Sequence, residues 1–396
     1  MLGLRKSGLE RSLVALLVWI PLFFLLVVSR SASVQQWRTA YYFQPSSGTL
    51  PIASAPFSKY THVTQANLLP TSACGLDSTT YGLTGNIAPF VSAVHAAGAK
   101  ALVTLFGDSV TGGYLATCTD SSNLSAFVTT LSSFVNSNGY DGIDVDWEAN
   151  VDSYPTQWEN LMSALRAALP GKTISCSVTI TERYMASAVQ SSIDQVNIMN
   201  YERDPWLYSG GYASDTWYNS ATLAGGDTNH PTAEMDVQYF IGAGVASGKI
   251  GLGMPFYGRI KQGCLMGYLS GSTCNQDVYA TVQTYASGNA GTNPRAAILY
   301  RDLLQSAYWS SGTQVWDAAH GAQYIQYTAA GASQAAFIPY TGVQQIQSVV
   351  NYVKNNNLGG VMTYELSYEY VGTATGDARY PLSTAMYQAL HVGAGQ

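Results

Sequence analysis

Residues 141–148 read Asp-Gly-Ile-Asp-Val-Asp-Trp-Glu. Acidic residues at 144, 146 and 148 alternate with Ile143, Val145 and Trp147, and this is the period of a β-strand. One face of the predicted strand therefore carries three carboxyl groups, about 6–7 Å apart in successive steps. The other face is apolar and is expected to lie against helices. Three carboxyl groups directed into an interior are costly unless they are hydrogen-bonded or share protons, so this strand indicates a functional site.

The acidic strand is one of eight short β-rich runs that alternate with helical patterns. The runs are 39–43, 62–66, 101–106, 142–147, 173–180, 196–200, 250–254 and 360–364. Helical apolar spacing is found at 87–97, 124–135, 156–169, 234–245 and 343–353. Strand–helix alternation predicts a parallel sheet, and eight repeats predict a (β/α)8 TIM barrel. Active sites in such barrels lie at the carboxyl ends of the strands, which is where residue 148 is expected.

The chain is longer than the roughly 250 residues that are typical of such a barrel. Most of the surplus lies between the seventh and eighth runs, where residues 260–336 contain their own turns and an aromatic strand-like piece at 323–327. We expect residues 34–396 to form the barrel, with 260–336 inserted as a small α+β subdomain.

The composition excludes several classes of protein. Of the 396 residues, 47% are hydrophobic, which is enough for a large core and excludes a disordered chain. The net charge is −6 and Lys/Arg runs are lacking beyond the N-terminus, so nucleic acid is not an expected partner. Five cysteines are too few for a small disulfide scaffold of this length.

The N-terminus has the pattern of an export signal. Arg5, Lys6 and Arg11 precede an apolar run of 16 residues, 13–28, which small residues follow. This is the order found in secretory signal peptides, whereas a membrane-spanning helix needs about 20 apolar residues. We expect residues 1–33 to be a cleaved signal and the protein to be secreted, with an uncleaved membrane anchor as the alternative.

Export to an oxidising compartment allows disulfides. Cys264 and Cys274 flank a short Gly/Ser-rich loop and form one candidate pair, while Cys74 and Cys118 follow predicted strands and form a second. Cys176 lies in an apolar run and is expected to be a buried free thiol. Clusters of Cys and His that would indicate a metal are lacking, and the sequence implies no cofactor.

The acidic strand resembles the signature of the family 18 glycoside hydrolases, the chitinases and their relatives. Further blocks follow in the order of that family, and the resemblance extends over essentially the whole of residues 34–396. They are QVNIMNY at 195–201, GMPFYGR at 253–259, AFIPY at 336–340 and GGVMTYEL at 359–366. The resemblance implies a barrel with an insertion between strands seven and eight, as in the subfamily with a deep substrate cleft.

The resemblance also implies a reaction: retaining hydrolysis of β-1,4-linked N-acetylglucosamine polymers, chitin or chitooligosaccharides, in which the substrate's own acetamido oxygen is the nucleophile. Glu148 would be the general acid, and the negative groups beside it should raise its proton affinity. Asp146 would orient the acetamido N–H and share a proton with Asp144. Tyr201 would donate a hydrogen bond to the acetamido carbonyl.

Six further residues are expected to contact the substrate: Met199, Glu202, Tyr257, Arg259, Tyr364 and Tyr41. Two of them depart from the family pattern. Glu202 replaces an Asp, and Tyr364 replaces the Trp that forms the floor under the sugar. These departures favour a shorter site, or one adapted to an N-acetylglucosamine polymer other than crystalline chitin.

Three alternatives stay open at this point. A lectin of the same fold would bind chitooligosaccharides without cleaving them. An endo-β-N-acetylglucosaminidase would act on peptidoglycan or N-glycans. A serine esterase would use Gly107-Asp108-Ser109 with Asp317 and His320, whose spacing is similar to that of the GDSL-type esterases. For the hydrolase we expect a monomer whose partner is an N-acetylglucosamine-containing saccharide, with no membrane contact beyond residues 1–33.

Overall fold

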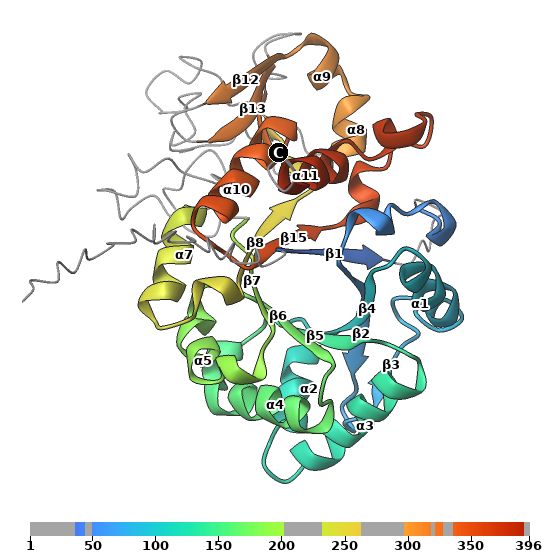
Figure 1. The fold of residues 1–396 in the computed structure, drawn as a ribbon, viewed down its shortest axis with the longest axis vertical. Helices are drawn as coiled ribbons and strands as arrows, with labels where there is room; N and C mark the ends of the chain where they lie inside the picture. The colour runs from blue at the N-terminus through green and yellow to red at the C-terminus, as the bar shows by residue number, and fades with distance from the viewer. Residues whose placement is uncertain are drawn as a thin grey trace, which may run out of the picture. The chain divides into compact units, whose positions relative to one another are not determined.

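Eight parallel strands close into a barrel (Figure 1). The structure, a computed structural model, describes residues 36–43, 50–201, 232–262, 297–317, 321–327 and 336–391. The barrel strands are β1 (Trp37–Phe43), β2 (His62–Pro70), β4 (Lys100–Gly107), β5 (Gly142–Trp147), β6 (Thr173–Val178), β7 (Gln195–Ile198), β8 (Ile250–Pro255) and β15 (Gly360–Tyr364). They pair in the order β1-β15-β8-β7-β6-β5-β4-β2, and a pairing of β1 with β2 closes the ring. The predicted (β/α)8 barrel is confirmed.

Helices surround this ring (Figure 1). They are α1 (Ile87–Ala96), α2 (Thr111–Cys118), α3 (Leu124–Ser137), α4 (Pro155–Ala168), α5 (Arg183–Ala188), α7 (Ala233–Gly242), α10 (Val343–Asn355) and α11 (Pro381–His391). In α4, Pro155 occupies the first turn, where its missing N–H costs nothing. The buried residues of α4 recur at helical spacing: Trp158, Leu161, Met162 and Leu165. These side chains share one hydrophobic core with Ile143, Val145 and Trp147 of β5.

Two strands end earlier than the sequence predicts. The run 173–180 ends as a strand at Val178, because Thr179 caps the 3-10 helix η4 (Ile180–Glu182). The Glu182 carboxylate accepts the backbone N–H of Thr179 at 3.0 Å, which completes a capping box. The run 196–200 ends as a strand at Ile198.

The barrel interior is largely polar. Thr39 donates to the side chain of Gln195 at 2.6 Å, and the hydroxyls of Thr64 and Thr104 lie 2.6 Å apart. All four residues are fully buried or nearly so. Each hydroxyl has a partner on another strand, which offsets the cost of removing it from water. A polar interior of this kind can hold carboxyl groups that an apolar one would exclude.

A second sheet lies in the chain between β8 and β15. Its strands are β9 (Tyr257–Arg259), β10 (Lys261–Gln262), β11 (Ala297–Leu299), β12 (Thr313–Asp317), β13 (Ala322–Tyr327) and β14 (Ala336–Tyr340), with α8 (Tyr300–Leu304) and α9 (Ala307–Ser311). The order is β11-β9-β14-β13-β12, with β10 paired to β14 and every pairing antiparallel. These strands reach a few residues beyond 260–336 on both sides. The limits of the insertion stay a prediction, because 263–296, 318–320 and 328–335 lie outside the described residues.

Cys74 and Cys118 form a disulfide, which confirms one of the two predicted pairs. The bridge joins the turn between β2 and β3 (Leu76–Asp77) to the end of α2, with 5.2 Å between the two Cα atoms. Cys176 is a buried free thiol, as predicted. Cys264 and Cys274 lie outside the described residues, so their pairing stays a prediction.

Residues 1–33 also lie outside the described residues, and the predicted signal or anchor stays a prediction. Within the described part of the chain, every helix is too short or too polar to span a lipid bilayer.

Candidate active site

The acidic residues of β5 lie at the carboxyl end of that strand. Asp144 and Asp146 are 1% and 4% exposed, and Glu148 follows the end of the strand and is exposed. The backbone N–H of Glu148 donates to the carbonyl of Gly107 at 3.0 Å, which ties this residue to the end of β4. The alternation predicted from the sequence therefore places two buried carboxyl groups below one that reaches solvent.

Asp144 is held by hydroxyl groups from two other strands. Tyr41 on β1 donates to its Oδ2 at 2.5 Å, and Ser175 on β6 donates to its Oδ1 at 2.6 Å. The Tyr41 hydroxyl also lies 2.6 Å from the Ser177 hydroxyl. Burial raises the pKa of Asp144, although these hydrogen bonds oppose the shift. The carboxyl group is thus fixed in place on both of its oxygens.

Asp146 has fewer partners than Asp144. Its Oδ1 is buried and has no hydrogen-bond partner among the described residues. Burial raises the pKa of Asp146 well above its usual range, and the charges of Glu148, Asp144 and Glu182 raise it further. Closely spaced carboxyl groups cannot all ionise cheaply, so this arrangement favours a proton held on Asp146.

Aromatic side chains gather beside these carboxyl groups. Tyr41, Ala66 and Met362 form a small buried cluster, against which Phe43, Met199, Tyr201 and Tyr364 lie. The ring centroids of Tyr41 and Tyr364 are 5.6 Å apart, and those of Tyr201 and Tyr364 are 6.4 Å apart. Gly253 makes room for Tyr201, because a Cβ there would lie 2.6 Å from the tyrosine ring. Tyr41, Met199, Tyr201 and Tyr364, predicted separately, thus lie in one group, which we call the aromatic cluster.

Tyr257 is joined to the aromatic cluster through an unpredicted residue. It lies on β9, is 4% exposed and meets Tyr368 edge-on at 6.1 Å, and Tyr368 meets Tyr364 at the same distance. Glu202 lies outside the described residues, and only the backbone of Arg259 is described. The substrate roles of these residues, and that of Tyr41, stay predictions.

Sequence reasoning missed four residues here. Ser175 and Ser177 alternate along β6, as the acidic residues do along β5, so the same period-2 argument would have directed both into the barrel. Phe43 is two residues from Tyr41 on β1 and shares its face. Tyr368 lies in the 3-10 helix η9 (Leu366–Glu369). The sequence around it has no strand or helix periodicity from which its direction could be predicted.

Other site chemistries find less support in the described residues. Clusters of three or more His, Cys, Asp or Glu that could hold a metal are lacking in that part of the chain. Ser109 of the esterase pattern is exposed after β4. The neighbouring Asp108 carboxylate accepts the N–H groups of Val110 and Thr111 at 2.9 and 2.8 Å, and so holds the turn. His320 lies outside the described residues.

Two curated chitinases are similar to this chain in sequence. Chitinase B of Serratia marcescens is 28% identical over 279 residues, and the match covers 58% of this chain and 55% of that protein. Chitinase A1 of Niallia circulans is 28% identical over 261 residues, and the match covers 59% of this chain and 35% of that protein. The chain therefore spans about half the length of the first relative and about a third of the second.

The fold is shared with a solved structure, the class V chitinase from Nicotiana tobaccum. The TM-score is 0.73 at 18% identity, over 90% of this chain and 99% of that one. The family model of the glycosyl hydrolases family 18 matches residues 38–369, a range that contains the barrel strands β2 to β15, most of β1, and the acidic residues of β5. The chain belongs to family 18 of the glycosyl hydrolases.

Proposed function

We propose that this protein hydrolyses β-1,4-linked N-acetylglucosamine polymers, chitin or chitooligosaccharides. One observation carries the proposal: Asp144 and Asp146 are buried at the barrel mouth directly below the exposed Glu148. Membership of family 18 supports it, as do the names of the two chitinases that resemble the chain. A mutant of the class V chitinase from Nicotiana tobaccum, whose fold is similar, has been solved in complex with NAG4.

In the proposed first step, Glu148 gives its proton to the oxygen of the leaving sugar. The bond between that oxygen and the anomeric carbon breaks while the acetamido carbonyl oxygen of the retained sugar bonds to the same carbon. Asp146 accepts the acetamido N–H while the proton that it shares with Asp144 moves to Asp144, and its negative charge then balances the positive charge that develops on the ring formed in this way. The buried Oδ1 of Asp146, which has no partner among the described residues, supports this role.

In the second step, water attacks the anomeric carbon, the bond between that carbon and the acetamido oxygen breaks, and Glu148 takes a proton from the attacking water. Two displacements on the same carbon retain the β-configuration. Asp144 is fixed by Tyr41 and Ser175. It keeps Asp146 in place and shares one proton with it. Tyr201 would donate a hydrogen bond to the acetamido carbonyl, which brings the internal nucleophile into attack geometry. The aromatic cluster supplies apolar surface for the sugar face.

The test compares wild type with Glu148→Gln on fluorogenic di- and tri-N-acetylchitooligosaccharides. We expect kcat to fall by about 10²–10⁴-fold, with an unchanged circular dichroism spectrum, because Glu148 is exposed and its loss removes no packing. Ser109→Ala, a control for the esterase pattern, should keep full activity. Near-normal turnover by Glu148→Gln would contradict the proposal, and so would saccharide binding by the wild type without turnover, which is the behaviour of a lectin.

The substrate within this class is tested by product analysis. Chitooligosaccharides, chitin, peptidoglycan and a high-mannose glycoprotein are incubated with the wild type, and the released saccharides are measured by mass spectrometry. We expect the chitooligosaccharides to be cleaved fastest. Faster release from peptidoglycan or from the glycoprotein would instead assign the endo-β-N-acetylglucosaminidase alternative.

A further inference from the structure

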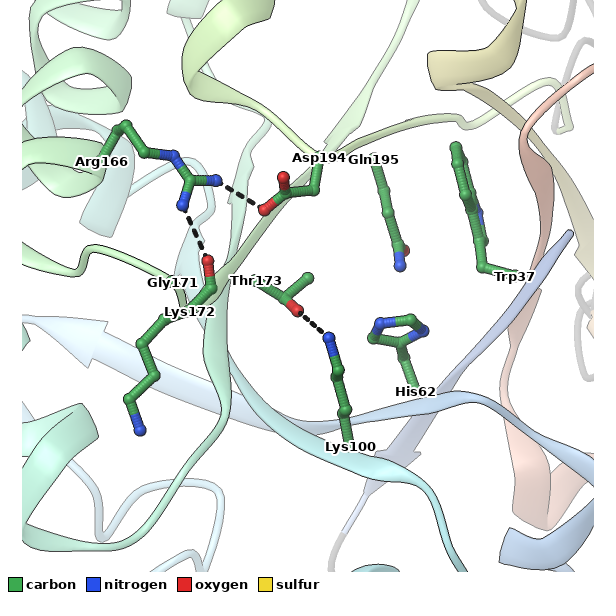
Figure 2. Close-up of a pocket in the computed structure, with 9 residues that line it drawn as sticks. All are labelled: Trp37, His62, Lys100, Arg166, Gly171, Lys172, Thr173, Asp194 and Gln195. Carbon is green, nitrogen blue, oxygen red and sulfur yellow. Dashed lines mark hydrogen bonds and ion pairs between the residues drawn. The ribbon is translucent and has the colours of Figure 1, made fainter. Parts of the chain in front are cut away.

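A polar cavity lies at the end of the barrel opposite to Glu148. Its volume is about 330 Å³, and Trp37, His62, Lys100, Thr173 and Gln195 are among the residues that line it. All five stand at the amino-terminal ends of barrel strands, β1, β2, β4, β6 and β7 (Figure 2). The acidic residues of β5 lie at the carboxyl end, so the two sites are separated by the barrel interior.

The lining of this cavity has an excess of positive charge. Three cationic side chains, Lys100, Arg166 and Lys172, line it together with a single carboxylate, Asp194. The whole chain has 18 Lys and Arg and 24 Asp and Glu, so acidic residues outnumber basic ones. Around this cavity the ratio is reversed, with three basic residues and one acidic residue. Such a concentration of charge attracts anions.

Two of these cations are already engaged. Arg166 forms an ion pair with Asp194 at 2.5 Å and donates to the carbonyl of Lys172 at 2.8 Å. The Lys172 ammonium donates to the carbonyl of Tyr140 at 2.5 Å, and its side chain extends away from the others in Figure 2. Asp194 is thereby neutralised, and the cationic group left to meet a ligand is Lys100.

Lys100 and Gln195 each present an N–H donor to the cavity. Among the described residues the Lys100 ammonium makes one hydrogen bond, a long one of 3.3 Å to Thr173, although an ammonium can donate three. Gln195 is 2% exposed; its Oε1 accepts from Thr39 at 2.6 Å, while its Nε2 has no partner in the described part of the chain. Figure 2 shows the amide end of Gln195 on the same side as Lys100 and His62.

The remaining wall is flat and rigid. The Trp37 indole donates to Asn197 at 3.1 Å and lies so close to Gly251 that a Cβ there would come within 2.9 Å of the indole nitrogen. His62 contributes a ring without charge near neutral pH, because burial, together with the charge of Lys100, lowers the pKa of this histidine to about 4. A planar or apolar group could therefore lie beside the two donors.

We propose that this cavity is a second ligand site, which binds a small organic oxyanion through a phosphate or carboxylate head group. The Lys100 ammonium and the Gln195 amide N–H hold the oxygens of the head group, and the body of the ligand lies against the indole of Trp37. The cavity exceeds the space of a single small anion, since one water takes about 30 Å³ in the liquid. The site is independent of the glycosidase reaction.

The test is isothermal titration calorimetry of the full chain with inorganic phosphate, phenyl phosphate and benzoate. We expect saturable 1:1 binding of phenyl phosphate or benzoate, tighter than that of inorganic phosphate, and the tighter of the two identifies the head group. Lys100→Gln should weaken this binding at least about tenfold, the usual effect of losing a hydrogen bond to a charged group. Lys100→Arg should stay close to wild type.

The matched control is Lys354→Gln, which makes the same charge change on α10. It should leave anion affinity unchanged, and Lys100→Gln should keep wild-type turnover of chitooligosaccharides. The absence of saturable binding for all three probes would overturn the proposal. Equal weakening by Lys100→Gln and Lys354→Gln would also overturn it, because attraction would then come from the overall charge and not from a site.

Discussion

Asp144 and Asp146 are chemically identical and only two residues apart, yet their surroundings differ. Both oxygens of Asp144 accept hydrogen bonds, from Tyr41 and Ser175, whereas Oδ1 of Asp146 has no partner among the described residues. Asp144 is therefore fixed, whereas Asp146 is the carboxyl group that we propose to accept a hydrogen bond from the acetamido group of the substrate. Alternation in the sequence predicts the shared face of the two residues. It cannot predict their partners, because these depend on the register between β5 and strands distant in sequence.

Tyr41→Phe tests the positioning of Asp144. Loss of one hydrogen bond to a buried carboxyl group costs about 1–3 kcal/mol, so we expect kcat on chitooligosaccharides to fall about tenfold to a hundredfold, with KM little changed. Tyr42→Phe is the matched control. Its hydroxyl is buried too but donates to the carbonyl of Leu50 at 2.8 Å, away from the acidic residues. An equal loss of kcat in both variants would contradict a positioning role for Tyr41.

At the scale of elements, the barrel strands were predictable and their ends less so. All eight β-rich runs are strands of the barrel; each run is rich in residues of high β-propensity, and helical periods follow most of them. The strand β6 ends before the predicted residue 180, because the Thr179–Glu182 capping box begins a 3-10 helix there. The pattern of apolar residues does not show this change from strand to helix. The strands of the second sheet are short, from two to six residues. In strands of this length, polar and apolar residues alternate too few times for the two-residue period to be detected.

The Cys74–Cys118 bridge fastens α2 to the turn after β2, and its removal should be costly. The bridge joins residues 44 positions apart, and disulfides of this kind typically contribute about 2–4 kcal/mol. We expect the Cys74→Ala, Cys118→Ala double variant to show a correspondingly lower free energy of unfolding in urea titrations. Dithiothreitol should lower the stability of the wild type more than that of the double variant, in which only the predicted Cys264–Cys274 pair would be left to reduce. Equal losses in the two proteins would contradict this assignment.

At the scale of the whole molecule, charge is separated along the barrel, with carboxyl groups at one mouth and cations at the other. Two further acids are buried near the C-terminus. Glu365 is 1% exposed and Glu369 is fully buried, and burial raises the pKa of each to about 7. The sequence predicts a chain of low charge density, but it does not show which glutamate side chains are buried and which are exposed. Only the fold identifies these two as acids whose pKa is raised to about 7.

These buried glutamates predict greater stability in acid. Their pKa values rise from 4.5 in the unfolded chain to about 7 in the folded protein, so the folded state binds more protons between these values. Their contribution to the free energy of unfolding is on the order of 1–3 kcal/mol for each group. It is complete below pH 4.5 and is lost as the pH rises through 7. His62 acts in the opposite direction, since its pKa falls to about 4, but the buried carboxyl groups whose pKa is raised outnumber it.

The measurement is the free energy of unfolding from pH 5 to pH 8. We expect it to fall with rising pH in the wild type and to fall less in Glu369→Gln, which removes one of the two titrations. Glu159→Gln on α4, which is only partly buried, is the control and should follow the wild type. A stability that increases from pH 5 to pH 8 in the wild type would contradict the account.

The configuration of the first product tests the central claim most directly. Wild-type protein is mixed with penta-N-acetylchitopentaose, and the anomeric protons of the new reducing ends are followed by ¹H NMR before mutarotation. Attack by the acetamido oxygen, followed by water, predicts that the β-anomer appears first and the α-anomer only later. Initial release of the α-anomer would mean that water displaces the leaving group directly, and would contradict the roles given to Asp146 and Glu148.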